Sequence, residues 1–464
     1  MSTGPRARSC SRPSLKIQKT PPGPDWTVTK AKGSDQLDAR LTDAHRLVHP
    51  RHRRRGRVGV WRHLGPGLIT GAADDDPSGI GTYSQLGAQF GVGMLWTVPI
   101  SFPLAAAVEE LAARLGLAGK EGLAALIKRS FPRPALYGLS VLVAAANTFN
   151  VGADVGAMAA SARLVVPIPF LVLLVCITGV LLFLEIVVTY HNYARLLRLL
   201  TLSLLAYIGV LAVVKVDWLA VASNLVVPHL SLQKEYIAGL VAILGTTISP
   251  YLMFWQCSEE VEETADRKAG IRITRTRILG MRVDVIAGMA AAVAIMFAIM
   301  VACAYTLGAH GAREIGTADQ AAQVLEPLAG NLAGLLFALG VIGTGSLAVP
   351  VLAGSTAYAL SETFGWREGL AMRFREASGF YGVIIASMFA GLAMNLAGIE
   401  PIRALFYAAL LNGLAAPPVI GSMLVLGNRA GAVGRHRSGW LSNLLVGFAC
   451  LLMTALPLIY LALR

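Results

Sequence analysis

From residue 64 to the end of the chain, apolar stretches recur that are each long enough, at about 20 residues, to cross a hydrocarbon layer of roughly 30 Å as a helix. Short polar segments separate them, and most Lys and Arg residues in these segments fall in alternate loops, which predicts a cytoplasmic N-terminus. The fold class is therefore an all-α polytopic membrane protein. We predict eleven transmembrane helices, near 64–90, 91–112, 134–163, 167–190, 193–214, 235–258, 279–308, 328–362, 379–398, 401–426 and 440–463.

Composition supports this interpretation. Of the 464 residues, 55% are hydrophobic and 14% charged, and the mean hydropathy is +0.61. Soluble domains carry about 45–50% apolar and about 25% charged residues, so an aqueous globule is excluded. The five cysteines form no CxxC pair and the eight histidines no HExxH, which argues against a disulfide framework and a zinc site. No motif for catalysis or nucleotide binding stands in a supporting context, so we expect neither an enzyme nor a cofactor.

Residues 1–60 are polar and end in a basic run, 51–57. We predict a disordered cytoplasmic tail, followed by a membrane domain over 61–464. The net charge of +13 would suit a nucleic acid if the basic residues lined one soluble face, but they are spread over the tail and the loops. We therefore expect no nucleic acid as a partner. Positive-inside anchoring explains the basic run more simply than binding to anionic lipid.

The first apolar stretch contains three consecutive carboxylates, Asp74, Asp75 and Asp76, directly before Pro77. A charge inside a membrane costs a few kcal/mol on insertion scales, and a proline leaves backbone groups without helical partners. Such a break is tolerated only where the freed groups line a cavity or hold an ion. Consecutive helical residues point about 100° apart, so the three acids cannot all face one ion. We assign Asp76 to the ion, and the other two to a vestibule or a proton path.

The sixth stretch contains a second break, between Gly245 and Pro250. A single proline in a spanning helix favours a structural kink, but here the breaks lie in the first helix of each half when spans 1–5 and 6–10 are paired. This pattern is typical of an inverted-repeat transporter of the LeuT type, with its substrate between two broken helices at the middle of the membrane.

The side chains and carbonyls at the two breaks form an all-oxygen set: the Asp76 carboxylate, the carbonyls of Ala73 and Thr246, and the hydroxyls of Thr246 and Ser249. Oxygen ligands suit hard divalent cations such as Mg²⁺, Mn²⁺ and Ca²⁺. An organic ammonium could use the same groups, so an amino-acid or amine transporter is the alternative. A receptor or scaffold that binds metal without moving it is a third possibility.

Two motifs in the first stretch resemble a known family. Residues 65–77 and the segment Gln85–Gly91 (QLGAQFG) are similar to the first span of the Nramp family of divalent-metal transporters, where Asp-Pro-Gly-Asn precedes Gln-x-Gly-Ala-x-Phe-Gly. The resemblance implies eleven spans, a cytoplasmic N-terminus, a cell-membrane location and inward metal transport by alternating access. By position, Asp76 looks like the metal-binding Asp and the Ala73 carbonyl like its backbone partner, whereas Gly79 stands where the family has Asn.

In the sixth span the family reads Ala-x-x-Met-Pro-His. Here Thr246 takes the Ala place, Ser249 the Met place and Tyr251 the first His place, and a further family His falls on Gln256. A Met thioether is a soft ligand that favours Mn²⁺ and heavier ions over the alkaline earths, so Ser249 removes that bias. The Nramp-related branch proposed to carry Mg²⁺ likewise lacks the Met. We therefore expect a hard cation, Mg²⁺ or Mn²⁺, without ranking the two.

The resemblance also raises the question of whether transport is coupled to protons. Asp154 aligns with the family's proton-path Asp, but the Glu expected three residues later is Ala157. A buried Asp can relay protons, so symport stays an option. Otherwise Asp154 would pair with an arginine or cap a local helix break near Asn147 and Asn150. In the tenth span, Asn412 falls where family members place a polar residue near the metal.

Overall fold

The computed structural model describes residues 70–71, 73–187, 202–265, 274–310, 314–370 and 372–463, and all regular structure in these ranges is helical. The predicted tail, residues 1–60, lies outside the described residues. In the described part, eight helices are long and apolar enough to cross a membrane, or up to ten if each of two bent pairs counts as one span. The all-helical membrane fold is therefore confirmed.

Seven long helices coincide with predicted spans to within a few residues. They are α6 (Arg133–Ala162), α7 (Phe170–Val187), α13 (Arg275–Tyr305), α16 (Ala333–Phe364), α17 (Ser378–Leu396), α18 (Pro401–Asn428) and α20 (Trp440–Ala462). The shorter elements are α5 (Leu123–Ser130), α14 (Ala318–Ala322), α15 (Glu326–Ala329), α19 (Ala430–Val433), η2 (Gly91–Met94), η4 (Gly308–His310), η5 (Gln323–Leu325) and η6 (Gly330–Leu332).

Two stretches differ from the predicted pattern. The second span forms α4 (Thr97–Gly119), which ends seven residues later than expected, and it makes a 115° bend with the segment before it.

The fifth span is described only from η3 (Leu202–Leu204) and α9 (Leu205–Val213), because its first half lies outside the described residues. A further helix, α10 (Trp218–Val226), then turns by 119°. Asp217 caps the start of α10, its carboxylate accepting from the amides of Leu219 and Ala220. The count of eleven spans stays a prediction.

The first predicted break is present. Residues 73 and 74 are helical, Asp75 and Asp76 are not, and α3 (Pro77–Phe90) begins at the proline. Proline suits the first helical position because its missing N–H would have no partner there. Asp76 is the N-cap, with an extended backbone and its carboxylate on the Gly79 amide. The sequence Asp-Pro therefore both ends one helical segment and starts the next.

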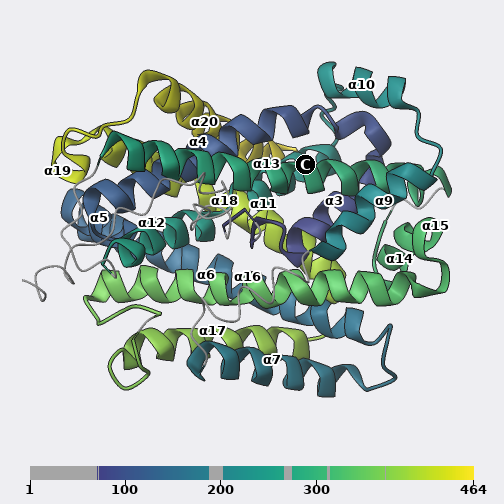
Figure 1. Ribbon diagram of the computed structural model, residues 1–464, viewed down its shortest axis with the longest axis horizontal. Helices are drawn as coiled ribbons and strands as arrows, with labels where there is room; N and C mark the ends of the chain where they lie inside the picture. Colours follow the sequence, from purple (N-terminus) through teal and green to yellow (C-terminus); the bar gives the residue numbers. More distant parts are fainter. Residues whose placement is uncertain are drawn as a thin grey trace, which may run out of the picture. The chain divides into compact units, whose positions relative to one another are not determined.

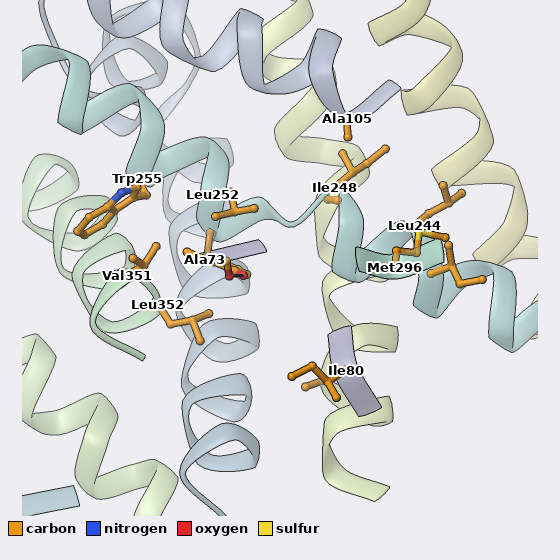
Figure 2. Close-up of a cluster of buried hydrophobic side chains, with 14 of the residues drawn as sticks. Ala73, Ile80, Ala105, Leu244, Ile248, Leu252, Trp255, Met296, Val351 and Leu352 are labelled. Atoms are coloured by element: carbon orange, nitrogen blue, oxygen red, sulfur yellow. Dashed lines mark hydrogen bonds between the residues drawn. The ribbon is translucent and has the colours of Figure 1, made fainter. Parts of the chain in front are cut away.

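The second predicted break separates α11 (Lys234–Thr247) from α12 (Pro250–Ala265). Ile248 and Ser249 lie between them, since the residue before a proline is pushed out of the helical region. Figure 2 shows the ribbon between Ile248 and Leu252 as a thin loop joining two coils. The hydroxyl of Ser249 shares its one hydrogen between the carbonyls of Gly245 and Thr246, at 2.8 and 2.9 Å, and so partners carbonyls at the end of α11.

The two broken segments are held by the long helices around them. In Figure 1, α16 runs past α6 and α12, with α17 and α7 on the far side, and α16 packs against α6, α17 and α12. Helix α18 packs against α11, α3 and α6. At Gly245 a Cβ would lie only 2.1 Å from the Ala409 carbonyl oxygen, so glycine is what allows α11 and α18 to approach so closely. The breaks are thereby placed next to α6 and α18.

Candidate cation site at the two helix breaks

The carboxylate of Asp76 is the centre of the site, and its first oxygen belongs to the start of α3. Oδ1 accepts from the Gly79 amide at 2.8 Å and from the Ser78 hydroxyl at 2.6 Å. These are the bonds of an N-cap, made where the helix end carries a partial positive charge. The side chain of Asp76 is thus fixed by its own segment.

The second oxygen of Asp76 is held by other helices. Oδ2 accepts from Nδ2 of Asn150 on α6 and from the hydroxyl of Tyr251 on α12, both at 3.2 Å. Asp76 is 1% exposed. A carboxylate buried this deeply is costly unless donors compensate its charge, and here four neutral donors from three helices do so.

The two breaks meet through hydroxyl groups. The Tyr251 hydroxyl shares its one hydrogen between Oδ2 of Asp76 and the carbonyl oxygen of Ala73, the latter at 3.1 Å. The Ser78 hydroxyl lies 3.3 Å from that of Thr246. A Cβ on Gly79 would lie 3.4 Å from the Thr246 hydroxyl oxygen and 3.4 Å from the Asp74 carbonyl oxygen, so Gly79 also faces the second break. Four of the five predicted metal-site residues therefore lie together.

The hydrogen-bonded groups at Asp76 are oxygen-rich and include one carboxylate, that of Asp76 itself. Carbonyl, carboxylate and hydroxyl oxygens come from Ala73, Asp76, Ser78, Thr246 and Tyr251. Within the described ranges, no group of three or more His, Cys, Asp or Glu side chains could hold a metal ion. An arrangement with one carboxylate and several neutral oxygens suits a hard cation that keeps part of its water.

Ser249, the fifth predicted ligand, is occupied with the backbone of α11. Its hydroxyl donates to the carbonyl of Thr246, which is itself a predicted ligand, and to that of Gly245. Among the described residues no hydrogen bond joins Ser249 to Asp76. The assignment of Ser249 and of the Thr246 carbonyl to the metal stays a prediction.

Asp154 lies close to the site on α6. It is fully buried, close enough to Asp76 for their charges to repel, and beside the Ser78 amide. In the described part of the chain, no ion pair joins Asp154 to an arginine. The alternative that it caps a break near Asn147 and Asn150 is wrong, because α6 runs without interruption from Arg133 to Ala162.

Gln256 and Asn412 lie farther from Asp76. Gln256 accepts a hydrogen bond from Thr70 and lies 3.4 Å from Glu260, so it joins α12 to the start of the first span. Asn412 on α18 is buried, and neither of its side-chain polar atoms has a partner among the described residues. Its neighbour Gly413 packs against Gly245. A role for either residue in transport stays a prediction.

Asn150 is a partner of Asp76 that was not predicted from the sequence. A polar face on α6 is formed by Asn147, Asn150 and Asp154, which follow one another at spacings of three and four. This spacing could have indicated that Asn150 lies near the site. Asn147 instead donates to the Thr356 hydroxyl on α16 at 3.1 Å. The carbonyl oxygen of Asn150 is buried without a partner within the described ranges, so turning this amide would offer a further oxygen at Asp76.

The chain is similar in sequence to proteins that are named as divalent metal cation transporters. "Divalent metal cation transporter MntH" of Burkholderia ambifaria is 27% identical over 409 residues, covering 87% of this chain and 89% of that protein. The protein of the same name from Deinococcus radiodurans is 29% identical over 333 residues, covering 68% of this chain and 72% of that protein.

Solved structures agree on the fold. A manganese transporter from Eremococcus coleocola, in complex with an aromatic bis-isothiourea substituted compound, is similar with a TM-score of 0.69 and 18% identity over 87% of each chain. Mhp1, a nucleobase-cation-symport-1 family transporter, is similar with a TM-score of 0.51 and 14% identity over 87% of this chain and 92% of that one. The family model for natural resistance-associated macrophage protein-like sequences, Nramp, matches residues 67–463. This chain belongs to the Nramp family.

Proposed function

We propose that this protein carries hard divalent metal cations inward across the cell membrane, and that Asp76 supplies the charge that binds them. The two helix breaks meet at the hydroxyl of Tyr251, which bridges the Ala73 carbonyl and the Asp76 carboxylate. This observation carries the proposal. A cation bound between these two oxygens would take over the bridging role of the hydroxyl hydrogen. The MntH relatives are named as divalent metal cation transporters.

The oxygen set favours Mg²⁺ and Mn²⁺. In the described ranges, no Met or Cys sulfur is among the groups that hydrogen-bond to Asp76, and Ser249 stands where the family has Met. Without a soft ligand, the binding site has no preference built in for heavier ions over the alkaline earths. Magnesium demands octahedral geometry and sheds water slowly, so we propose that the ion enters partly hydrated.

Alternating access is the proposed mode of transport. Asp76 is 1% exposed, so neither side of the membrane reaches it in this conformation. A cavity of about 520 Å³ lies at the ends of α3, α11 and α18 and is lined by Gly81, Gln85, Lys234 and Arg403 among others. Gly81 stands between one and two turns beyond Asp76 on α3. We propose this cavity as the outer entrance.

On the opposite side, contacts at the end of α12 close the path. Glu262 accepts hydrogen bonds from the Tyr358 hydroxyl on α16 and from the Leu370 amide, the latter at 3.0 Å. Thr70, at the start of the first span, donates to Gln256. We propose that these contacts break when the ion leaves toward the cytoplasm. A membrane potential alone favours entry of a divalent ion by roughly 4–5 kcal/mol per 100 mV, so coupling to protons through Asp154 is optional.

Cation flux into proteoliposomes tests the proposal. The purified protein should admit Mn²⁺, with Mg²⁺ competing, and Asp76→Ala should abolish the flux. Asp319→Ala, at an exposed acid in the loop helix α14, is the matched control and should transport normally. Uptake of labelled amino acids or amines without metal flux would support the alternative carrier, and binding of metal without flux would support the scaffold.

A further inference from the structure

Three carboxylates next to the site have oxygens without a hydrogen-bond partner in the described part of the chain. Asp74 and Glu109 are each 1% exposed and Asp75 is 5% exposed. One side-chain oxygen of each aspartate and both oxygens of Glu109 lack a hydrogen-bond partner among the described residues. Asp76, by contrast, has two donors on each oxygen. Among the described residues, the hydrogen-bond donors at the helix breaks therefore compensate both oxygens of Asp76 and leave these oxygens of its neighbours without a partner.

Glu109 lies on α4, close to Asp74 of the first break. The charges of Asp75, Glu109 and Asp76 all act on Asp74, so Glu109 lies within electrostatic range of Asp74. Gly71, just before them, packs with its Cα directly against the backbone of Gly288 on α13, and α13 in turn packs against α4. The start of the first span is thus held beside α13, on the side of Asp76 that leads toward the predicted cytoplasmic end of α4.

The ion pairs of Arg114 and Arg282 are made with Glu110 and not with Glu109. The adjacent residue, Glu110, forms ion pairs with Arg114 and with Arg282, the latter at 2.7 Å. Arg114 also donates to the carbonyl of Arg437 at 3.1 Å. The two neighbouring glutamates therefore differ: one oxygen of Glu110 pairs with two arginines, whereas Glu109 is buried and no ion pair to it is found among the described residues. An uncompensated carboxylate in the membrane interior is strongly disfavoured and is a mark of an ion pathway.

We propose that Asp74 and Glu109, with Asp75 beside them, form a second binding site for a divalent cation, on the cytoplasmic side of Asp76. This inference rests on the proposed function, because it supplies the next position for an ion that leaves Asp76. Since no three carboxylates in the described part converge as a metal cluster, the ion is held by two carboxylates and its own water. The inner site draws the cation out of the Asp76 site and toward the cytoplasm.

The stoichiometry of Mn²⁺ binding to the detergent-purified full chain tests the inner site, with free Mn²⁺ followed by electron paramagnetic resonance. The wild-type protein should bind two ions, and Glu109→Gln should bind one. Asp74→Asn changes the other element of the site and should also bind one, which covers the case in which the α4 variant fails to fold. Asp76→Asn should retain the inner ion, and Asp319→Asn, at an exposed acid, should retain both.

Each outcome decides between the inner site and its alternatives. A single Mn²⁺ ion on the wild-type protein that Glu109→Gln and Asp74→Asn leave unchanged would overturn the inner site, while the proposed function would stand. Unchanged binding combined with an altered pH dependence of flux in Glu109→Gln would overturn it in favour of a proton carried by Glu109. No Mn²⁺ binding by the wild-type protein would overturn the proposed function itself.

Discussion

The hydroxyl of Tyr251 lies 3.2 Å from Oδ2 of Asp76 and, at the same time, 3.1 Å from the carbonyl oxygen of Ala73. These two oxygens come from opposite ends of the break in the first span, and the hydroxyl comes from the helix that follows the break in the sixth. One side chain thus joins both interrupted helices at the carboxylate. A residue in this position affects both the stability of the closed site and the binding of a cation there.

Tyr251→Phe should weaken the protein without metal and strengthen its response to metal. The substitution leaves two buried acceptors with one donor fewer, at a cost of about 1–3 kcal/mol. Because a bound cation would then be the only partner bridging the two oxygens, Mn²⁺ should raise the melting temperature of the variant more than that of the wild type. Thermal unfolding in detergent, with and without Mn²⁺, measures both effects. An unchanged melting temperature without metal would contradict the bridging role.

On α6, Asn150 contacts Asp76 and Asn147 does not, so the two positions provide a test and its control. Asn150→Ala removes a donor from Asp76 and a candidate oxygen ligand, so the affinity for Mn²⁺ should fall by about ten-fold, the equivalent of one hydrogen bond to a charged group. Asn147→Ala breaks the bond to Thr356 and leaves Asp76 untouched, so it should lower stability alone. Isothermal titration with Mn²⁺ separates them. Equal affinities in the two variants would exclude Asn150 from the site.

Ser249 offers a test of ion selectivity. Ser249→Met should shift the preference from Mg²⁺ toward Mn²⁺ and Cd²⁺, because a thioether is a soft ligand. Ser249→Ala is the control, since it removes the same hydrogen bonds to the carbonyls of Gly245 and Thr246 and adds no sulfur. Competition of several cations against labelled Mn²⁺ uptake gives the series. Identical series for both variants would show that residue 249 does not contact the ion.

Glu368, in the segment that follows α16, makes the stability of the protein sensitive to pH. Burial, and then the nearby carboxylates of Glu362 and Glu262, raise the pKa of Glu368 from 4.5 to about 9. The folded protein therefore holds a proton there that the unfolded chain releases, and the stability it contributes is present below about pH 4.5 and lost as the pH rises through 9. Glu368→Gln should flatten this part of the melting temperature profile between pH 5 and 9. A profile parallel to that of the wild type would contradict the assignment.

The positions of the breaks and the identity of Asp76 could be predicted from the sequence because they follow from local rules. Proline interrupts the hydrogen bonding of a helix, and a charged side chain inside a membrane is costly unless it binds an ion or a compensating partner. The partners of Asp76 could not be predicted in the same way. Asn150 and Tyr251 reach it from residues 74 and 175 positions away, and which faces meet depends on the packing of α6 and α12 around α3.

The same limit applies to the adjacent acids on α4. Nothing in the sequence distinguishes Glu109 from Glu110, since both lie near the predicted cytoplasmic end of an apolar stretch. They point about 100° apart, so only one of them can face Arg282, which is 172 positions away along the chain. The fifth span was also less predictable, because α9 ends at Val213 and the turn into α10 depends on Asp217 as a cap.

Anomalous diffraction from crystals soaked in Mn²⁺ tests the role of Asp76 most directly, because it locates the ion itself. We predict a peak between the two helix breaks, at about 2.0–2.6 Å from the carboxylate of Asp76 and from the carbonyl of Ala73. The peak should be lost in Asp76→Asn crystals grown and soaked in the same way. A wild-type map with manganese peaks elsewhere and none beside Asp76 would contradict the account.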